Sequence, residues 1–269
     1  TPYNTAPFSK IKTEDFLPAF VRAIKNAKIE IGLIVDSKDT PSFKNTIEAL
    51  DYAGEQLDRI SSIFFNLNAA ETNESIQEIA QEVSPLLTEF SNDVALNATL
   101  FERVKLIYNY RNSLSLSKEQ KTLLDKKYKG FSRNGANLNK EQKETLRAID
   151  KEQSKLKLSF GENILAETNR YELIITDLSD LDGLPEGAIE AAKQTADEKG
   201  KKGWLITLDY PSYVPFMTYA KNRPLRKELA LAFGRKGFQN DALDNQEIVL
   251  KISQLRFKRA QLLGYKTHA

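Results

Sequence analysis

The residues whose types could do chemistry gather late in the chain, between Tyr210 and Arg226. The stretch 210–217, Tyr-Pro-Ser-Tyr-Val-Pro-Phe-Met, holds two prolines and two tyrosines, which predicts a rigid, partly exposed segment. Arg223 and Arg226 follow it, and a guanidinium group can bind a carboxylate through two parallel hydrogen bonds. The candidate ligand-binding residues are therefore Tyr210, Tyr213, Arg223 and Arg226.

Each of these candidates also has a structural interpretation. Residues 210–217 would serve equally as a packing turn that joins a strand to a helix, and the arginines as ion-pair partners of helix acids. From the residues alone we favour the structural interpretation, because such roles are the more common ones. A basic stretch at Lys199, Lys201 and Lys202 is interpreted as a solvated loop, since no aromatic residues alternate with it.

Cysteine and histidine, on which many catalytic sites depend, are almost missing from the chain. The chain has no Cys and a single His, His268, at its penultimate position. Disulfides, thiol catalysis, Ser-His-Asp triads and the His-Glu-x-x-His zinc motif are therefore excluded. Neither a Gly-x-x-x-x-Gly-Lys-Ser/Thr loop nor a Gly-x-Gly-x-x-Gly turn occurs. We assign no catalytic residue, no metal ligand and no bound cofactor to this chain.

Composition and charge are those of an ordinary globular protein. The 269 residues include 39 Lys and Arg against 37 Asp and Glu, a net charge of +2, with 41% hydrophobic residues. This balance gives no electrostatic drive toward nucleic acid or an anionic membrane. No apolar run approaches the ~20 residues of a membrane-spanning helix. Residues 1–4 lack a basic segment followed by an apolar one, so we expect no signal peptide there.

Helical periodicity dominates the first part of the chain. Apolar residues recur every three or four positions over 16–34, which predicts one helix. A second helix should begin at Thr40-Pro41 and continue to Phe64. A third should follow Thr72, with a kink or break at Pro85 because proline removes a backbone donor.

Three capping signals organise the next helices. Asn97 is an expected N-cap, and Ser117 and Asn139 each begin a capping box with a Gln three positions later. The periodic pattern that follows Asn139 continues to about Ala166. It predicts a single helix long enough to span a domain.

The pattern changes after residue 170. Residues 171–176 and 204–208 are rich in β-formers and predict two strands paired in a small sheet, whose direction we leave open. An Ala-rich helix should begin at 184–186, and helices should return after Pro211, interrupted at Pro224. The expected fold class is mostly α, with residues 1–168 as a helical bundle region and 169–269 as the β element plus helices.

Several stretches, in their order and spacing, resemble one known family. The most specific is 210–217 together with Asn222, Arg223 and Arg226. The others are residues 8–20, 43–50, 64–67, 128–136, 181–185 and 255–265. The chain resembles the N-terminal half of a bacterial peptidyl-dipeptidase (dipeptidyl carboxypeptidase) of the thimet oligopeptidase family of zinc metallopeptidases.

This resemblance implies both a fold and an activity. Members fold as two mostly helical lobes around a deep channel, and the N-terminal lobe supplies a wall that admits short peptides. In the whole protein, zinc would polarise the scissile carbonyl and activate a water, with a Glu as general base. Peptidyl-dipeptidases release C-terminal dipeptides. Both sequence regions would then belong to the one N-terminal lobe, and in the functional interpretation residues 210–217 would line its channel.

One departure from the family is informative. The catalytic His-Glu-x-x-His motif lies C-terminal to the segment matched here by Leu263-Gly264-Tyr265, and it is absent. The resemblance therefore implies a chain truncated before the catalytic zinc domain, and no zinc ligand or catalytic Glu can be carried over. Pro224 also stands where a better helix former is expected.

Two functional hypotheses follow. The leading one is the substrate-channel-forming N-terminal lobe of a zinc-dependent peptidyl-dipeptidase or oligopeptidase. Its partners would be short peptides and the C-terminal catalytic lobe of the same polypeptide, with zinc in the parent protein only. The alternative is a non-catalytic helical protein-interaction module. A bacterial origin is implied, with the cytoplasm and the periplasm both open as locations.

Overall fold

The computed structural model describes residues 5–269, so the expectation about a signal peptide at residues 1–4 lies outside the described residues. The chain forms two compact units. Unit 1 comprises Thr1–Leu158 and Ile252–Ala269, and unit 2 comprises Ser159–Lys251. The mostly α fold class with a small two-strand sheet is confirmed. The division expected after residue 168 stays a prediction.

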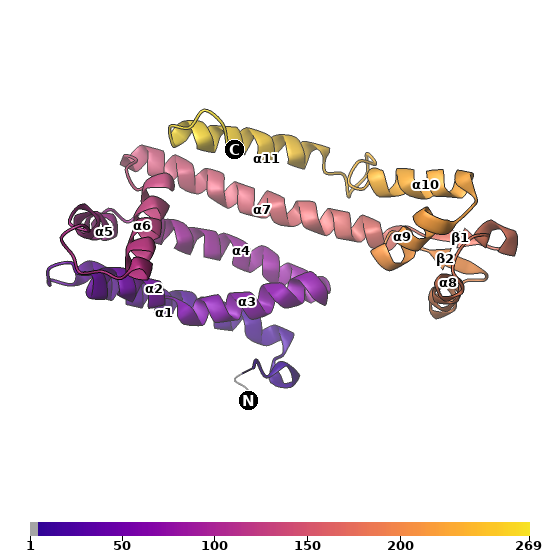
Figure 1. Cartoon of the computed structure of the whole chain (residues 1–269), viewed down its shortest axis with the longest axis horizontal. Helices are drawn as coiled ribbons and strands as arrows, with labels where there is room; N and C mark the ends of the chain where they lie inside the picture. The colour runs from indigo at the N-terminus through magenta and orange to yellow at the C-terminus, as the bar shows by residue number, and fades with distance from the viewer. Residues whose placement is uncertain (1–4) are drawn as a thin grey trace. The chain divides into compact units, whose positions relative to one another are not determined.

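Unit 1 consists of helices. Its short 3-10 turns and helices are Phe8–Lys10, Thr13–Asp15, α1 (Phe16–Asp36), a π-helical turn (Phe43–Glu48), α2 (Ala49–Tyr52), α3 (Glu55–Ala70), α4 (Glu74–Ala95), α5 (Ala98–Asn109) and α6 (Lys118–Arg133). It also includes the first part of α7 (Lys140–Arg170) and the last part of α11 (Gln246–Leu262). Figure 1 shows α1, α3 and α4 running side by side.

A hydrophobic cluster holds α1, α3 and α4 together, with aromatic rings from α1 and α3 and with Ile76, Ala80 and Val83 from α4. Phe64 is fully buried, and its ring centroid lies 5.0 Å from that of Phe16 and 5.3 Å from that of Phe20, both edge-on. Phe65 adds a third edge-on contact to Phe64 at 5.1 Å. At the other end of α4, the Asp93 carboxylate forms ion pairs with Lys28 of α1 at 2.8 Å and with Arg147 of α7 at 2.7 Å. Burial of apolar side chains therefore contributes most of the stability of this packing, and the Asp93 ion pairs lie at its edge.

The second helix differs from the expectation at both of its ends. It begins after Ser42 rather than at Thr40-Pro41, because the Ser42 Oγ accepts the Asn45 N–H at 3.1 Å. It also stops before Gly54, whose φ of +87° ends α2 and allows α3 to begin. The Glu30 carboxylate holds this break by accepting the Gly54 N–H at 2.7 Å.

The capping predictions are confirmed, and one proline behaves differently. The side chains of Asn97, Ser117 and Asn139 each accept the backbone N–H three residues later, at 2.9, 3.2 and 2.9 Å. The helix expected from Asn139 is the long α7. At Pro85, by contrast, α4 does not break but continues over its whole length from Glu74 to Ala95.

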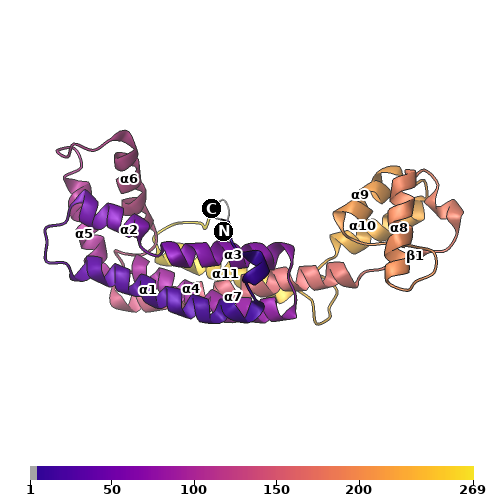
Figure 2. The same cartoon turned by 90° about the horizontal axis from the view of Figure 1, so that it is seen from below.

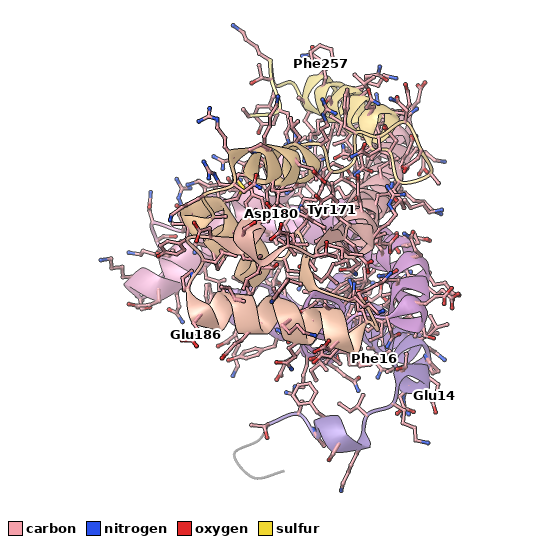
Figure 3. The ribbon with its side chains drawn as sticks, turned by 90° about the vertical axis from the view of Figure 1, so that its right-hand side faces the viewer. Glu14, Phe16, Tyr171, Asp180, Glu186 and Phe257 are labelled. Atoms are coloured by element: carbon pink, nitrogen blue, oxygen red, sulfur yellow. The ribbon has the colours of Figure 1, made fainter. Side chains whose placement is uncertain are left out.

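Unit 2 is built around the small sheet. After the end of α7 come β1 (Leu173–Ile175), a 3-10 turn (Leu178–Leu181), α8 (Glu186–Glu198), β2 (Trp204–Ile206), α9 (Tyr210–Tyr219) and α10 (Arg223–Gly234). The strands are antiparallel, with Leu173 opposite Ile206 and Ile175 opposite Trp204. Figure 2 shows α8, α9 and α10 gathered around β1. Figure 3 shows α8 from outside, beginning at Glu186.

A close backbone approach at Gly203 and the buried side chain of Asn245 stabilise this small unit. Gly203 precedes β2 with a φ of +97°, and a Cβ there would lie 2.2 Å from the Ile175 carbonyl oxygen. Asn245 is 2% exposed; its Nδ2 donates to the Phe160 carbonyl at 3.1 Å, and its Oδ1 accepts from Asn163 Nδ2 at 3.0 Å. These bonds attach the chain after α10 to the end of α7 in unit 2.

No helix in the described part of the chain is both long and apolar enough to cross a membrane.

Candidate functional site

The segment expected as a packing turn is a helix. Residues 210–219 form α9, with Pro211 in the first turn, where its missing N–H removes no helical hydrogen bond. The interpretation of this stretch as a turn between strand and helix is therefore wrong. α9 packs against α10, and the two helices form a hairpin connected by Ala220, Lys221 and Asn222.

The two candidate tyrosines lie at one end of this hairpin. The Tyr213 ring stacks on the Phe233 ring of α10, with centroids 4.2 Å apart and planes 24° apart. Tyr210 meets the same ring edge-on at 6.0 Å, and 69% of Tyr210 is exposed. The Lys236 ammonium lies 4.0 Å from the Phe233 centroid. Tyr213 is thus part of the packing, whereas Tyr210 remains accessible to a ligand.

The two candidate arginines lie at the other end and differ in their surroundings. Arg226 is partly buried and donates from Nη1 to the carbonyl oxygen of Ala220, which ends α9. Arg223 is exposed, and its guanidinium has no hydrogen-bond or ion-pair partner among residues 5–269. Neither arginine forms the ion pair with helix acids that the structural interpretation predicted.

The structure brings the candidates together in pairs and not as a group of four. Because Tyr210 begins α9 and Tyr219 ends it, the tyrosine end and the arginine end are separated by the length of α9. At a rise of ~1.5 Å per residue this length is ~14 Å. The hairpin therefore offers an accessible phenol at one end and an unpaired guanidinium at the other.

The opposite face of α9 closes a cavity of about 470 Å³. The cavity lies within unit 2, between the end of α7, α8, β2 and α9. Its lining residues are Thr168, Asn169, Leu184, Ala188, Ala191, Ala192, Thr195, Lys199, Ile206, Thr207, Asp209, Pro211, Ser212, Pro215 and Phe216. A volume of this size is within the ~300–1,000 Å³ that is usual for small-molecule pockets.

Polar groups converge on the β2–α9 corner of this cavity. The Thr207 hydroxyl donates to Asp209 Oδ2 at 3.0 Å, and the Thr207 N–H donates to Ser212 Oγ at 2.9 Å. This group could not be predicted from the sequence, because no motif marks it and the other walls of the cavity are contributed by residues from Thr168 onward. The signal available was the Thr-x-Asp-x-x-Ser spacing directly after a predicted strand.

The basic loop of the sequence is engaged with a carboxylate. Lys199 and Lys201 bind the two oxygens of Glu172 at 3.1 and 3.3 Å. Hydrogen bonds from both ammonium groups hold the pKa of Glu172 below its ordinary value. The neighbouring Tyr171 is different: burial, together with the nearby Glu228 carboxylate, raises the pKa of Tyr171 to about 12. The interpretation of this loop as merely solvated is therefore incomplete.

Within the described residues, no group of three or more His, Cys, Asp or Glu side chains could hold a metal ion. The donor groups of these described residues therefore do not fit a zinc site.

No protein-family model matches the chain. Curated relatives do match it over its whole length. It is 33% identical over 269 residues to the dipeptidyl carboxypeptidase of Escherichia coli and 31% identical over 273 residues to the oligopeptidase A of the same organism. In both comparisons the match covers 100% of this chain but only 40% of the relative. A thimet-like oligopeptidase of Dictyostelium discoideum is 29% identical over 263 residues, 97% of this chain and 37% of the relative.

The chain is thus a mostly helical segment that matches only part of the length of its relatives, with no metal site in the described residues. More narrowly, the chain is a homologue of part of the dipeptidyl carboxypeptidase and oligopeptidase A family. The resemblance inferred from the sequence is confirmed.

Proposed function

We propose that this chain is the N-terminal, channel-forming lobe of a zinc-dependent peptidyl-dipeptidase or oligopeptidase that hydrolyses short peptides. The observation that supports this function is the identity of 31–33% over the entire chain to dipeptidyl carboxypeptidases and oligopeptidases A. Residues 1–168 and 169–269 would both be parts of this one lobe.

The catalytic chemistry would belong to another part of the same polypeptide. Zinc, when bound there, would supply Lewis acidity and an activated water. None of the residues described for this chain is assigned to that step, since they offer no suitable donor group. The role that remains for this chain is to bind and orient the peptide and to exclude larger substrates.

The α9–α10 hairpin is the proposed peptide-contacting part. Arg223 is exposed and unpaired within the described chain, so it can bind the carboxylate of a peptide, while Tyr210 offers an exposed ring and hydroxyl. An extended peptide advances ~3.3–3.6 Å per residue, so about four residues would cover the ~14 Å between the two ends. Arg226 and Tyr213 would position the hairpin instead of touching peptide, because the packing already uses both.

Hydrolysis of tetrapeptides that are acetylated at the N-terminus and keep a free C-terminal carboxylate tests the proposal in a protein in which this chain continues into a His-Glu-x-x-His motif. We expect dipeptide products by mass spectrometry and loss of activity on chelation. An intact, zinc-loaded protein that releases no dipeptide and cleaves no other short peptide would overturn the proposed function.

Substitution of the arginines tests the binding assignment. Arg223→Gln should raise KM about tenfold with little change in kcat, since it removes a contact made equally in ground and transition states. Lys202→Gln is the matched control, because it removes an exposed cation of unit 2 that lies outside the hairpin. Arg226→Gln should instead lower the free energy of unfolding by about 1–2 kcal/mol. An unchanged KM in the Arg223 variant would refute the contact.

A further inference from the structure

The exposed carboxylate of Asp209 lines the unit 2 cavity and has no ion-pair partner among the described residues. Asp209 stands at the N-cap of α9, yet its side chain caps nothing. The N–H groups of Ser212 and Tyr213 both donate to the Asp209 backbone carbonyl, at 2.9 and 2.7 Å, and Pro211 has no N–H. Asp209 Oδ2 accepts the Thr207 hydroxyl, and no Lys or Arg of residues 5–269 forms an ion pair with it. A ligand cation would complete this group.

One cation of a group with net positive charge lines the same cavity at the end of α8. Lys199 lines the cavity at the end of α8, and Glu172 is its ion-pair partner at 3.1 Å. Glu172 is shared, because Lys201 binds its other oxygen at 3.3 Å. The three side chains together therefore carry a net charge of +1. Of the two cations, Lys199 is the one that lines the cavity.

The other residues that line the cavity suit a ligand with a short side chain and a polar backbone. Ala188, Ala191 and Ala192 form the α8 wall, and their small size is what leaves the space open. Pro215 and Phe216 contribute apolar surface from α9. The Thr168 and Thr195 hydroxyls donate to backbone carbonyls of their own helices, so their oxygens remain as acceptors for a peptide-like ligand, and Asn169 adds an amide.

We propose that this cavity binds a small zwitterion, a free amino acid or a dipeptide, with its ammonium group against Asp209 and its carboxylate against Lys199. Two opposite charges on the wall of one cavity select for a ligand that carries both, and they disfavour a ligand in which either is blocked. The proposal rests on the cavity and its charges. It deepens the proposed function only in that dipeptides would be the products of the whole protein, and would then occupy a site on the face of α9 opposite Tyr213.

Isothermal titration of the 269-residue chain tests the proposal without any hydrolysis. The probes are L-alanine, L-Ala-L-Ala, N-acetyl-Ala-Ala and Ala-Ala amide. We expect Ala-Ala to bind with a dissociation constant of about 1 mM or lower and each blocked peptide to bind at least about tenfold more weakly. Binding by alanine as well identifies any free amino acid as a ligand; binding by Ala-Ala alone identifies the dipeptide. Failure of both free ligands to bind, or equal binding of the blocked peptides, overturns the site.

Four variants locate the binding. Asp209→Asn and Lys199→Met should each weaken binding of Ala-Ala at least about tenfold. Their controls are Asp182→Asn and Lys202→Met, which remove the same charges from exposed residues that do not line the cavity.

A filled cavity gives an independent readout. Ala188→Leu places three more carbon atoms into the cavity, and binding should be lost while circular dichroism reports an intact fold. Binding that survives both charge variants and the filled cavity would overturn the proposal. Because these titrations need no catalytic lobe, their failure would leave the proposed peptidase function standing.

Discussion

Replacement of Asn245 by Ala should selectively destabilise unit 2. Asn245 is 2% exposed, and its side chain makes two hydrogen bonds, to the Phe160 carbonyl at 3.1 Å and with Asn163 at 3.0 Å. Two such bonds contribute ~1 kcal/mol each, and the partly buried Asn163 amide left without its partner costs ~1 kcal/mol more. We expect Asn245→Ala to lower the free energy of unfolding of unit 2 by about 2–4 kcal/mol.

The single tryptophan of the chain, Trp204, makes this measurable, because it lies in β2 of unit 2. Urea unfolding followed by Trp204 fluorescence reports this unit. Gln194→Ala is the control: Gln194 is exposed and makes one side-chain bond, to Glu198, so its loss should cost ~0.5 kcal/mol or less. The double variant with Asn163→Ala should show a coupling of about 1 kcal/mol. A loss below ~1 kcal/mol for Asn245→Ala would refute the reasoning.

Three further predictions follow from the packing and the titrating groups. Phe64→Ala should cost about 3–5 kcal/mol, measured by urea unfolding and circular dichroism, since it empties the centre of the hydrophobic cluster of unit 1; a cost below ~1 kcal/mol would contradict that packing. Because the pKa of Tyr171 is raised to about 12, its protonated form stabilises the fold, and that contribution should be lost as pH rises from ~10 through the folded pKa. Glu228→Gln should move the tyrosinate absorbance transition to lower pH, and an unmoved transition would exclude Glu228 as a cause. Asp93 is partly buried, which raises its pKa, but its hydrogen bonds to two cations outweigh burial and lower it. Its contribution to stability is therefore present above the unfolded pKa and lost as pH falls through the folded one, so Asp93→Asn should flatten the acid limb of the stability profile.

Local signals account for the features that the sequence predicted well. The capping boxes at Ser117 and Asn139 involve residues three positions apart, so the sequence contains the whole interaction. The long α7 and both strands were likewise predicted from local patterns of apolar and β-forming residues. The family resemblance succeeded for a related reason: several short stretches had to occur in one order.

Features that depend on distant residues could not be read in this way. The end of α2 is fixed by Glu30, which accepts a hydrogen bond from Gly54 across 24 positions. In α9, two prolines suggested a turn, but Pro211 occupies a first-turn position that a helix tolerates. Arg226 was expected to bind acids, yet it donates to the end of the preceding helix. The cavity combines residues from Thr168 to Phe216, which only the folded unit brings together.

The close approach at Gly203 limits how this sequence can diverge. Any side chain there would place its Cβ 2.2 Å from the Ile175 carbonyl oxygen and would push apart the strands that follow α7 and precede α9. Substitution of Gly203 by any other residue is therefore disfavoured unless the pairing of β1 with β2 also changes. In sequences about as distant as these relatives, we expect glycine here even where both flanking residues have changed. A descendant that lost it would have to lengthen the turn before β2, and such paired changes would trace the history of this small sheet.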